Sequence, residues 1–244
     1  MKLYSDDFGY NREADNGIIR LIKEKKLFGV SVLSTMVSSL SLRKLRRTLN
    51  WKRNFILGLH INLIEGKPAQ HFLNVNTLVH QDGKFSPLII FLVKILLGKI
   101  DKAQIKSEIE KQLAKLYKMG LTVKMLDSHQ HTHAFSPVAE VVVELAEKYK
   151  VTYIRSFNSI RTYSYKARIT YAILKFLAFL SYFLTYKKIG MPATWRVKRE
   201  FDWTVMSWEG GSFDAASIND CRAAFVIHPY LPYDTNRSYL KYIK

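Results

Sequence analysis

The chain has 244 residues, of which 48% are hydrophobic, and this length and composition suit one α/β domain with a large core. A single cysteine, Cys221, excludes an internal disulfide framework and is typical of a reducing compartment. Lys and Arg outnumber Asp and Glu by 38 to 20, and the net charge of +18 predicts anionic partners such as nucleic acid, lipid head groups or phosphorylated substrates. Asp6 and Asp7 interrupt the N-terminus before an apolar signal-peptide core could form, so we expect a cytoplasmic protein.

Strand-like and helix-like patterns alternate along the chain. The apolar run at residues 1–4 predicts a short first strand, and the next pattern predicts a helix at residues 15–26 that Gly29 ends. Ser39 or Ser41 is expected to cap a short basic helix that follows. Further apolar, β-rich runs predict strands at residues 30–36, 55–57, 123–126, 151–155, 203–208 and 224–228.

The clearest helix covers residues 101–119, where apolar residues recur at spacings of three and four and Gly120 ends the pattern. Pro137 suits the first turn of another helix, which runs to about Lys148. Repeated strand–helix units without a long polar linker predict one domain over residues 1–244, built on one barrel-like parallel sheet. The residues expected to be buried on the two amphipathic helices are Ile18, Ile19, Leu21, Ile22, Ile105, Ile109, Leu113 and Leu116.

Chemically active side chains follow three of the predicted strands. Asp6 and Asp7, then His60, then the histidine-rich segment 127–133 each come directly after an apolar run. Because polar side chains just past the ends of parallel strands converge on one face of a sheet or barrel, we expect these groups to lie together. One carboxylate and two imidazoles that converge there form a three-ligand divalent-metal site with open positions, which a metal-assisted hydrolase needs. Both aspartates can reach one site only if the chain turns at once after the strand, and Phe8-Gly9 supplies such a turn.

Several residues near these motifs have more than one interpretation. His129, His131 and His133 alternate along the chain, so not all three can bind one metal; one is expected to be a ligand and the others to form hydrogen bonds or line the cleft. Asp127 is expected to orient His129 or a backbone turn, and Glu65 to cap a turn.

Five motifs occur in a fixed order over roughly residues 1–235: Asp6-Asp7-Phe8-Gly9, Gly58-Leu59-His60 with Leu63-Ile64-Glu65-Gly66-Lys67-Pro68, Gln81-Asp82-Gly83-Lys84-Phe85, Leu126-Asp127-Ser128-His129-Gln130-His131-Thr132-His133, and Ile227-His228-Pro229. On these motifs the chain resembles the YdjC-type carbohydrate deacetylases, a family with members that act on chito-oligosaccharides and on a hopanoid-linked sugar. The resemblance implies a distorted (β/α) barrel of the polysaccharide-deacetylase-like type.

The resemblance also implies an activity and the residues that carry it. It implies a divalent metal ion, Mg²⁺ or Zn²⁺, and hydrolysis of the N-acetyl group of an acetylated amino sugar on an oligosaccharide or a lipid-linked glycan. It makes Asp7, His60 and His129 the metal ligands and Asp6 the base. His228, at the end of a later strand, is the candidate acid that gives a proton to the departing amine.

Two further residues are candidates for substrate binding. Arg155 ends a predicted strand and suits a substrate hydroxyl or carboxylate, and His131 lines the cleft. The chain departs from the family pattern at Tyr230, where a small residue is usual. It also ends at Lys244, where the family would continue with another helix and strand, so a shortened domain is one expectation.

Two other functions account for part of these features. Asp and His clusters at barrel strand ends also hold metals in phosphoesterases, but that chemistry usually needs two metals and more ligands than these motifs supply. A basic module that binds nucleic acid or membrane explains the net charge but leaves the carboxylate pair and the histidines without a role. We therefore expect an enzyme without a nucleic-acid partner, and a homodimer is left open.

Two apolar stretches, residues 87–97 and 169–186, stand apart from the motifs. Neither reaches the roughly 20 uninterrupted apolar residues that a spanning helix needs, so we expect no transmembrane segment. The commoner outcome is a buried helix or an oligomer interface. The alternative is an interfacial helix at the inner face of an anionic membrane. The basic residues that flank the second stretch favour this alternative: Lys166, Arg168, Lys187 and Lys188.

Overall fold

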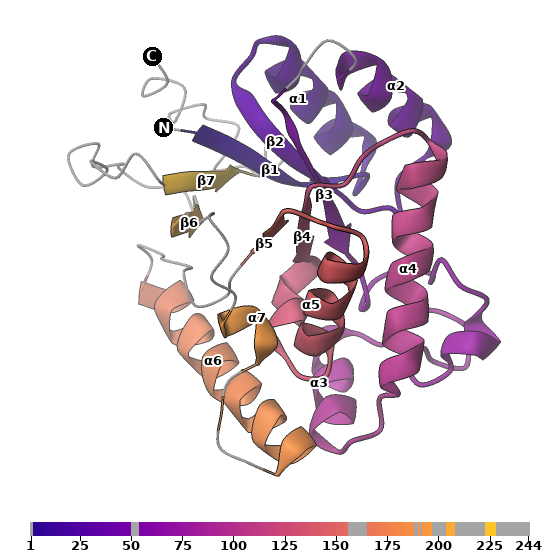
Figure 1. Cartoon of the computed structure of the whole chain (residues 1–244), viewed down its shortest axis with the longest axis vertical. Helices are drawn as coiled ribbons and strands as arrows, with labels where there is room; N and C mark the ends of the chain where they lie inside the picture. The colour runs from indigo at the N-terminus through magenta and orange to yellow at the C-terminus, as the bar shows by residue number, and fades with distance from the viewer. Residues whose placement is uncertain are drawn as a thin grey trace.

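The computed structural model describes residues 2–49, 54–155, 165–187, 190, 192–196, 204–207 and 223–227. Strands and helices alternate through most of this part of the chain (Figure 1). In order they are β1 (Lys2–Phe8), α1 (Arg12–Lys23), β2 (Leu27–Val32), α2 (Ser39–Leu49), β3 (Ile56–Ile61), the 3₁₀ helix η1 (Phe72–Val75), α3 (Leu88–Leu96), α4 (Lys102–Lys118), β4 (Met125–Ser128), the 3₁₀ helix η2 (His129–Ala134), α5 (Val138–Lys148), β5 (Tyr153–Ile154), α6 (Tyr165–Tyr186), α7 (Ala193–Arg196), β6 (Thr204–Ser207) and β7 (Ala223–Ile227).

The strands form one seven-stranded sheet in the order β5-β4-β3-β2-β1-β7-β6, and every neighbouring pair is parallel. Helices α1, α4 and α5 contact this sheet from the outside (Figure 1). β5 and β6 are the two edge strands, and within the described residues no backbone hydrogen bonds join them, so the barrel is open between these two strands. The predicted α/β class and the distorted barrel are confirmed. Because the strands are parallel, their carboxyl ends all lie on the same side of the sheet. The prediction of one domain over residues 1–244 stays a prediction.

The first strand is longer than the four residues expected, because it continues through both aspartates to Phe8. Asp7 has a φ of 60°, and the register of β1 against β2 shifts between Ser5 and Phe8. Consecutive strand residues normally point to opposite faces, so this irregular step lets both carboxylates turn toward one site. The break therefore lies at Asp7 itself and not, as expected, in the turn after the strand.

The helix boundaries follow from local capping. Helix α1 ends at Lys23, and Gly29 lies inside β2 instead of ending the helix. A Cβ atom at Gly29 would lie 2.5 Å from the Tyr4 ring, so this position requires glycine for close packing. The Ser41 backbone N–H donates to Ser38 Oγ at 3.0 Å, which makes Ser38 the capping residue of α2 in place of Ser39 or Ser41.

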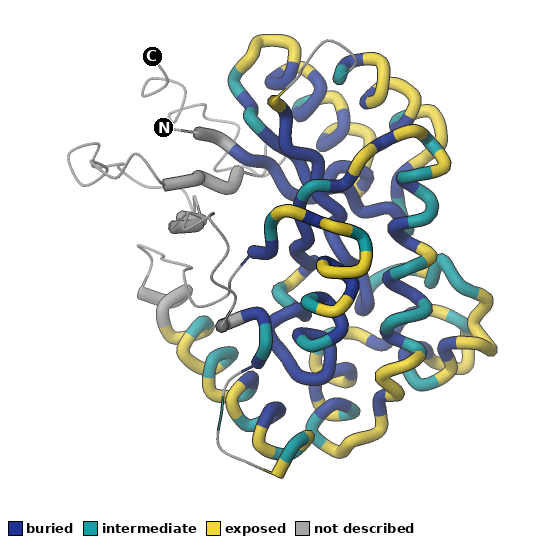
Figure 2. Tube along the Cα trace, viewed as in Figure 1, coloured by how far each residue is buried: buried dark blue, intermediate teal, exposed yellow. Residues whose placement is uncertain are grey.

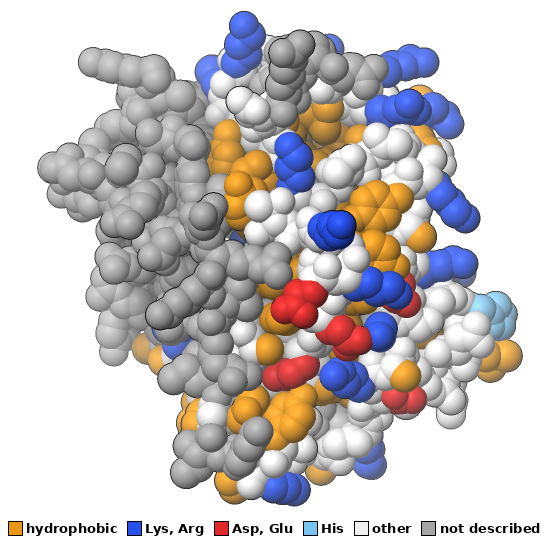
Figure 3. Space-filling model, in the orientation of Figure 1, with side chains coloured by type: hydrophobic (Ala, Val, Ile, Leu, Met, Phe, Trp, Pro, Cys, Tyr) orange, Lys and Arg blue, Asp and Glu red, His pale blue; other side chains and the backbone are white. Residues whose placement is uncertain are grey.

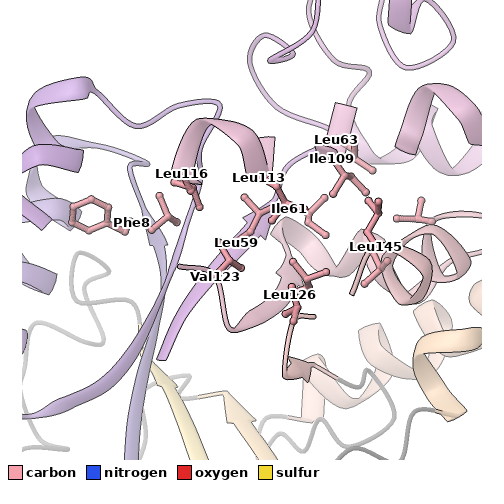
Figure 4. Packing of buried hydrophobic residues seen from close by; sticks show 14 of the residues in the cluster. Phe8, Leu59, Ile61, Leu63, Ile109, Leu113, Leu116, Val123, Leu126 and Leu145 are labelled. Atoms are coloured by element: carbon pink, nitrogen blue, oxygen red, sulfur yellow. The ribbon is translucent and has the colours of Figure 1, made fainter. Parts of the chain in front are cut away.

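The core lies between the sheet and the outer helices, and Figure 2 shows β2, β3 and β4 largely buried while the outer helices alternate between buried and exposed positions. Figure 4 shows Leu59 and Ile61 of β3 packed near Ile109 and Leu113 of α4. Each such side chain stabilises the fold by about 1.5–3 kcal/mol when buried. The packing fixes β3, and with it the residue at its end that enters the site. All eight residues that the sequence predicted to be buried on α1 and α4 are buried.

Candidate metal centre

Three predicted ligands come together at the carboxyl ends of neighbouring elements. Asp7 lies at the end of β1, His60 near the end of β3, and His129 directly after β4. The Nε2 atom of His60 is 3.2 Å from Asp7 Oδ1, and the Nδ1 atom of His129 is 3.1 Å from the same oxygen. All three side chains are buried. Residues that are far apart in the sequence therefore meet as the motifs predicted.

The donor set of this trio fits a divalent metal ion. The three candidate ligand atoms lie within 4.8 Å of one another. Donors that each bind a metal at about 2.0–2.2 Å are themselves about 3 Å apart, which is close to the separations of 3.2 Å and 3.1 Å between Asp7 Oδ1 and the two histidine nitrogens. One carboxylate oxygen and two imidazole nitrogens also match the donors of hydrolytic metal sites with open positions.

The negative charge around the trio favours a cation. Burial raises the pKa of Asp7, but hydrogen bonds from His129 and His60 outweigh burial and lower that pKa, so the carboxylate is charged. Burial lowers the pKa of His60, but the charges of Asp127 and Asp6 outweigh it and raise that pKa to about 10. His60 therefore carries a proton near neutral pH, and a metal that binds Nε2 displaces this proton.

A second carboxylate orients each histidine. His60 Nδ1 lies 2.9 Å from Oδ1 of Asp127, which faces it across the β3–β4 register. His129 Nε2 lies 3.0 Å from Oε2 of Glu65. Once its other nitrogen has no proton, a histidine that donates one N–H to a carboxylate presents a lone pair to a metal, so these contacts favour the tautomer that binding requires. Asp127 thus contacts His60 where His129 was expected, and Glu65, expected to cap a turn, contacts a candidate ligand.

A buried network on α4 holds the loop that carries Glu65. Both carboxylate oxygens of Glu108 accept backbone N–H groups of this loop, from Ala69 and Gln70, at 2.9 Å each. Gln112 Nε2 donates to the backbone oxygen of Asn62 at 2.7 Å. The Asn62 side chain in turn accepts the Glu65 backbone N–H at 3.1 Å. The contact between the Glu65 carboxylate and His129 was not predicted from the sequence, although Glu65 lies inside the motif at residues 63–68.

Asp6, the predicted base, pairs with Arg155. Two guanidinium nitrogens donate to its two carboxylate oxygens at 2.7 Å each, and Nη2 also lies 2.8 Å from Asp127 Oδ2. Burial lowers the pKa of Arg155, but the charges of Asp127 and Asp6 outweigh burial and raise it, so the guanidinium stays charged. A bidentate pair has a fixed geometry, so Arg155 orients Asp6 beside Asp7. That Arg155 also holds a substrate group stays a prediction.

The other candidate residues lie around this centre. His131 Nε2 is 3.1 Å from the Tyr171 hydroxyl of α6, on the side of the site that α6 borders. His133 is fully buried, and its Nδ1 lies 2.6 Å from Ser128 Oγ. Burial, and then the charge of His131, lowers the pKa of His133 well below its usual value. Among the described residues, His129 alone of the three neighbouring histidines belongs to a group that could hold a metal. His228 lies outside the described residues, and its role stays a prediction.

Comparison with known proteins identifies the class that this sheet and centre define. The model of the YdjC-like protein family matches residues 2–235, so the chain belongs to the YdjC-like family, as its motifs predicted. The chain is 31% identical over 150 residues to a carbohydrate deacetylase of Thermoanaerobacter pseudethanolicus, and the match covers 60% of this chain and 56% of that protein. A carbohydrate deacetylase of Oceanobacillus iheyensis is 27% identical over 165 residues, 67% of each protein.

The matches do not extend over the full length of most relatives. A carbohydrate deacetylase of Homo sapiens is 29% identical over 153 residues, and the match covers 62% of this chain and 46% of that protein. The chain thus spans about half the length of the first curated relatives it matches. The crystal structure of an Enterococcus faecalis protein named for cellobiose-phosphate cleavage aligns with a TM-score of 0.53 at 23% identity. That alignment covers 72% of this chain and 64% of the other, and it supports the fold alone.

Proposed function

We propose that this protein is a metal-dependent hydrolase that removes the N-acetyl group from an acetylated amino sugar, either an oligosaccharide or a lipid-linked glycan. The observation that carries the proposal is the buried Asp7–His60–His129 group with a second carboxylate, Asp6, next to it in the chain. The relatives named carbohydrate deacetylase support the reaction and the class of substrate.

The reaction breaks an amide C–N bond, forms a C–O bond from water, and gives acetate and a free amine. A divalent ion, Mg²⁺ or Zn²⁺, held by Asp7, His60 and His129 would polarise the amide carbonyl and lower the pKa of a bound water from about 16 toward 7. Asp6 accepts the proton of the attacking water, and Arg155 keeps the carboxylate of Asp6 in position. His228 gives the proton that the departing amine needs, and His131 contacts the sugar.

Phosphate-ester hydrolysis is the alternative, and it usually uses two metals about 3.5–4 Å apart. A second group of potential ligands exists, formed by Asp6, His60 and Asp127. Arg155 lies 2.7 Å from Asp6 and 2.8 Å from Asp127, so a guanidinium cation already neutralises these two carboxylates. The second group also shares His60 with the first. These contacts favour one metal and amide hydrolysis.

The proposed reaction predicts release of acetate, because the bond that breaks is an amide. We expect the full chain, loaded with Mg²⁺ or Zn²⁺, to release acetate from at least one member of a panel of N-acetylated amino sugars and no phosphate from aryl phosphates. The measurement is coupled detection of acetate and of phosphate on the same enzyme sample. Phosphate release without acetate release would contradict the proposal and favour a phosphoesterase.

A further inference from the structure

Helix α6 is apolar on two opposite faces, and among the residues that the structure describes only one of these faces packs against the domain. On the packed face Ala178 and Tyr182 are buried, and Ser181 Oγ accepts the backbone N–H of Ser136 at 3.1 Å. The expectation of a buried helix therefore holds for this face alone. The opposite face is exposed, with the following exposed fractions: Ile169 46%, Ile173 54%, Phe176 64%, Phe179 39% and Phe183 41%.

Helix α3 contacts α6 and extends the exposed apolar surface. Its exposed residues are Ile89 at 77%, Ile90 at 41% and Val93 at 48%, and Leu97, which follows the helix, is exposed at 62%. Figure 1 places α6 and α3 at the lower end of the molecule, and Figure 3 shows hydrophobic side chains beside Lys and Arg side chains along that end. Apolar side chains that continue over two neighbouring helices are typical of an interaction surface and not of isolated exposed residues.

Charge identifies the kind of partner that fits this surface. Neither α3 nor α6 contains an Asp or a Glu. Lys99, just after α3, and Lys187, just after α6, are exposed. The whole chain carries a net charge of +18, so a second copy of the chain would be repelled, whereas an anionic surface would be attracted. Aromatic and aliphatic side chains beside lysines match the interface of an anionic lipid bilayer.

The packing of α6 determines how it can meet a bilayer. The segment Ile169–Tyr186 has a mean hydropathy of 1.5, and by length and composition alone it could cross a membrane. Its inner face, however, is held on the domain through Ser181 and Tyr182. We propose that α6 and α3 together dock this protein on an anionic lipid bilayer, with α6 lying parallel to the membrane and its Ile and Phe side chains inserted between the lipids.

The docking surface reaches the candidate centre through α6. The Tyr171 hydroxyl of this helix lies 3.1 Å from His131 Nε2, and the centroids of the two rings are 5.5 Å apart. A helix that rests on a bilayer by its outer face therefore borders the site by its inner face. If the proposed function holds, docking brings the site close to glycans that are anchored in the membrane. This step rests on the proposed function, and the docking itself does not.

Binding to lipid vesicles tests the proposal with the full chain. We expect the protein to sediment with vesicles of phosphatidylcholine and phosphatidylglycerol but not with phosphatidylcholine alone. Salt screens charge over about 10 Å at 0.1 M and does not screen apolar insertion, so added salt should weaken binding only in part. Replacement of Ile173 and Phe176 by serine should weaken binding by at least about tenfold.

A matched control separates the surface from general loss of apolar residues. Phe72 and Leu73 are also exposed, at 42% and 64%, but lie on η1, so Phe72→Ser with Leu73→Ser should bind vesicles like the wild type. Thermal melts check that each variant is folded. If the α6 variant unfolds, Ile89→Ser with Leu97→Ser at α3 takes its place and should weaken binding in the same direction.

Two results would overturn the docking proposal. One is failure of the wild type to bind anionic vesicles. If sedimentation velocity then shows a dimer that the α6 variant dissociates, the surface is the interface with a second copy of the chain. The other is equal binding by the wild type and by both surface variants. Acetate release from a soluble N-acetylated sugar is measured on the same samples. A protein that binds vesicles but releases no acetate would contradict the proposed function and leave the docking surface standing.

Discussion

Replacement of His60 or His129 by alanine is expected to remove bound metal and activity together. Each change takes one nitrogen donor from the proposed three-ligand site, and loss of a residue that only supports a ligand already costs about 10–100-fold in metal affinity. We therefore expect a loss of more than about a hundredfold for each ligand variant. Elemental analysis after dialysis measures the metal, and acetate release measures the activity.

The control for this prediction is a histidine outside the centre. His71 is exposed and belongs to none of the groups of described residues that could hold a metal, so His71→Ala should keep both metal and activity. Glu65→Gln provides an intermediate case, because it weakens the contact to His129 but leaves all three proposed ligands in place. Full metal occupancy in both His60→Ala and His129→Ala would show that the ligand assignment is wrong.

Replacement of Asp6 by asparagine is expected to separate the base from the ligands. The amide has nearly the same shape as the carboxylate but accepts no proton, so turnover should fall by about a hundredfold or more while metal stays bound. Asp7→Asn should weaken metal binding instead, since Asp7 Oδ1 lies 3.2 Å and 3.1 Å from the two histidine nitrogens. Turnover at saturating metal and metal content, measured on both variants, distinguish the two roles.

The ion pair of Asp6 requires a stability control. Arg155 is buried, and Asp6→Asn leaves Asp127 as its remaining charged partner among those contacts. Loss of one partner of a buried ion pair costs about 3–5 kcal/mol in unfavourable cases, so thermal melts must show that the variant is folded at the assay temperature. Near-normal turnover of folded Asp6→Asn at saturating metal would mean that another group is the base.

The sequence predicted that the candidate ligands meet because an apolar run precedes each of their motifs, and parallel strands bring their carboxyl ends to one side. It predicted the buried faces of α1 and α4 because their apolar residues keep the helical period. The length of β1 was underestimated because aspartates are rare inside strands. In the structure Asp6 and Asp7 extend the strand because Arg155 and the two histidines satisfy their charges.

Contacts that depend on register and loop position could not be predicted from the sequence. Asp127 orients His60 because the two residues are paired across β3 and β4, and the sequence alone does not give that register. Glu65 reaches His129 because Glu108 and Asn62 fix the loop between β3 and η1. The composition of α6 likewise does not show which of its two apolar faces packs against the domain.

The location of a bound metal decides whether Asp7, His60 and His129 are the ligands. Crystals of the full chain grown with Zn²⁺ and measured at the zinc absorption edge would show the ion by its anomalous signal. We predict one site bound by Asp7 Oδ1, His60 Nε2 and His129 Nδ1, the atoms that already lie together in the structure. An ion bound between Asp6 and Asp127 in place of the Arg155 guanidinium, with no signal at the predicted trio, would contradict this ligand assignment.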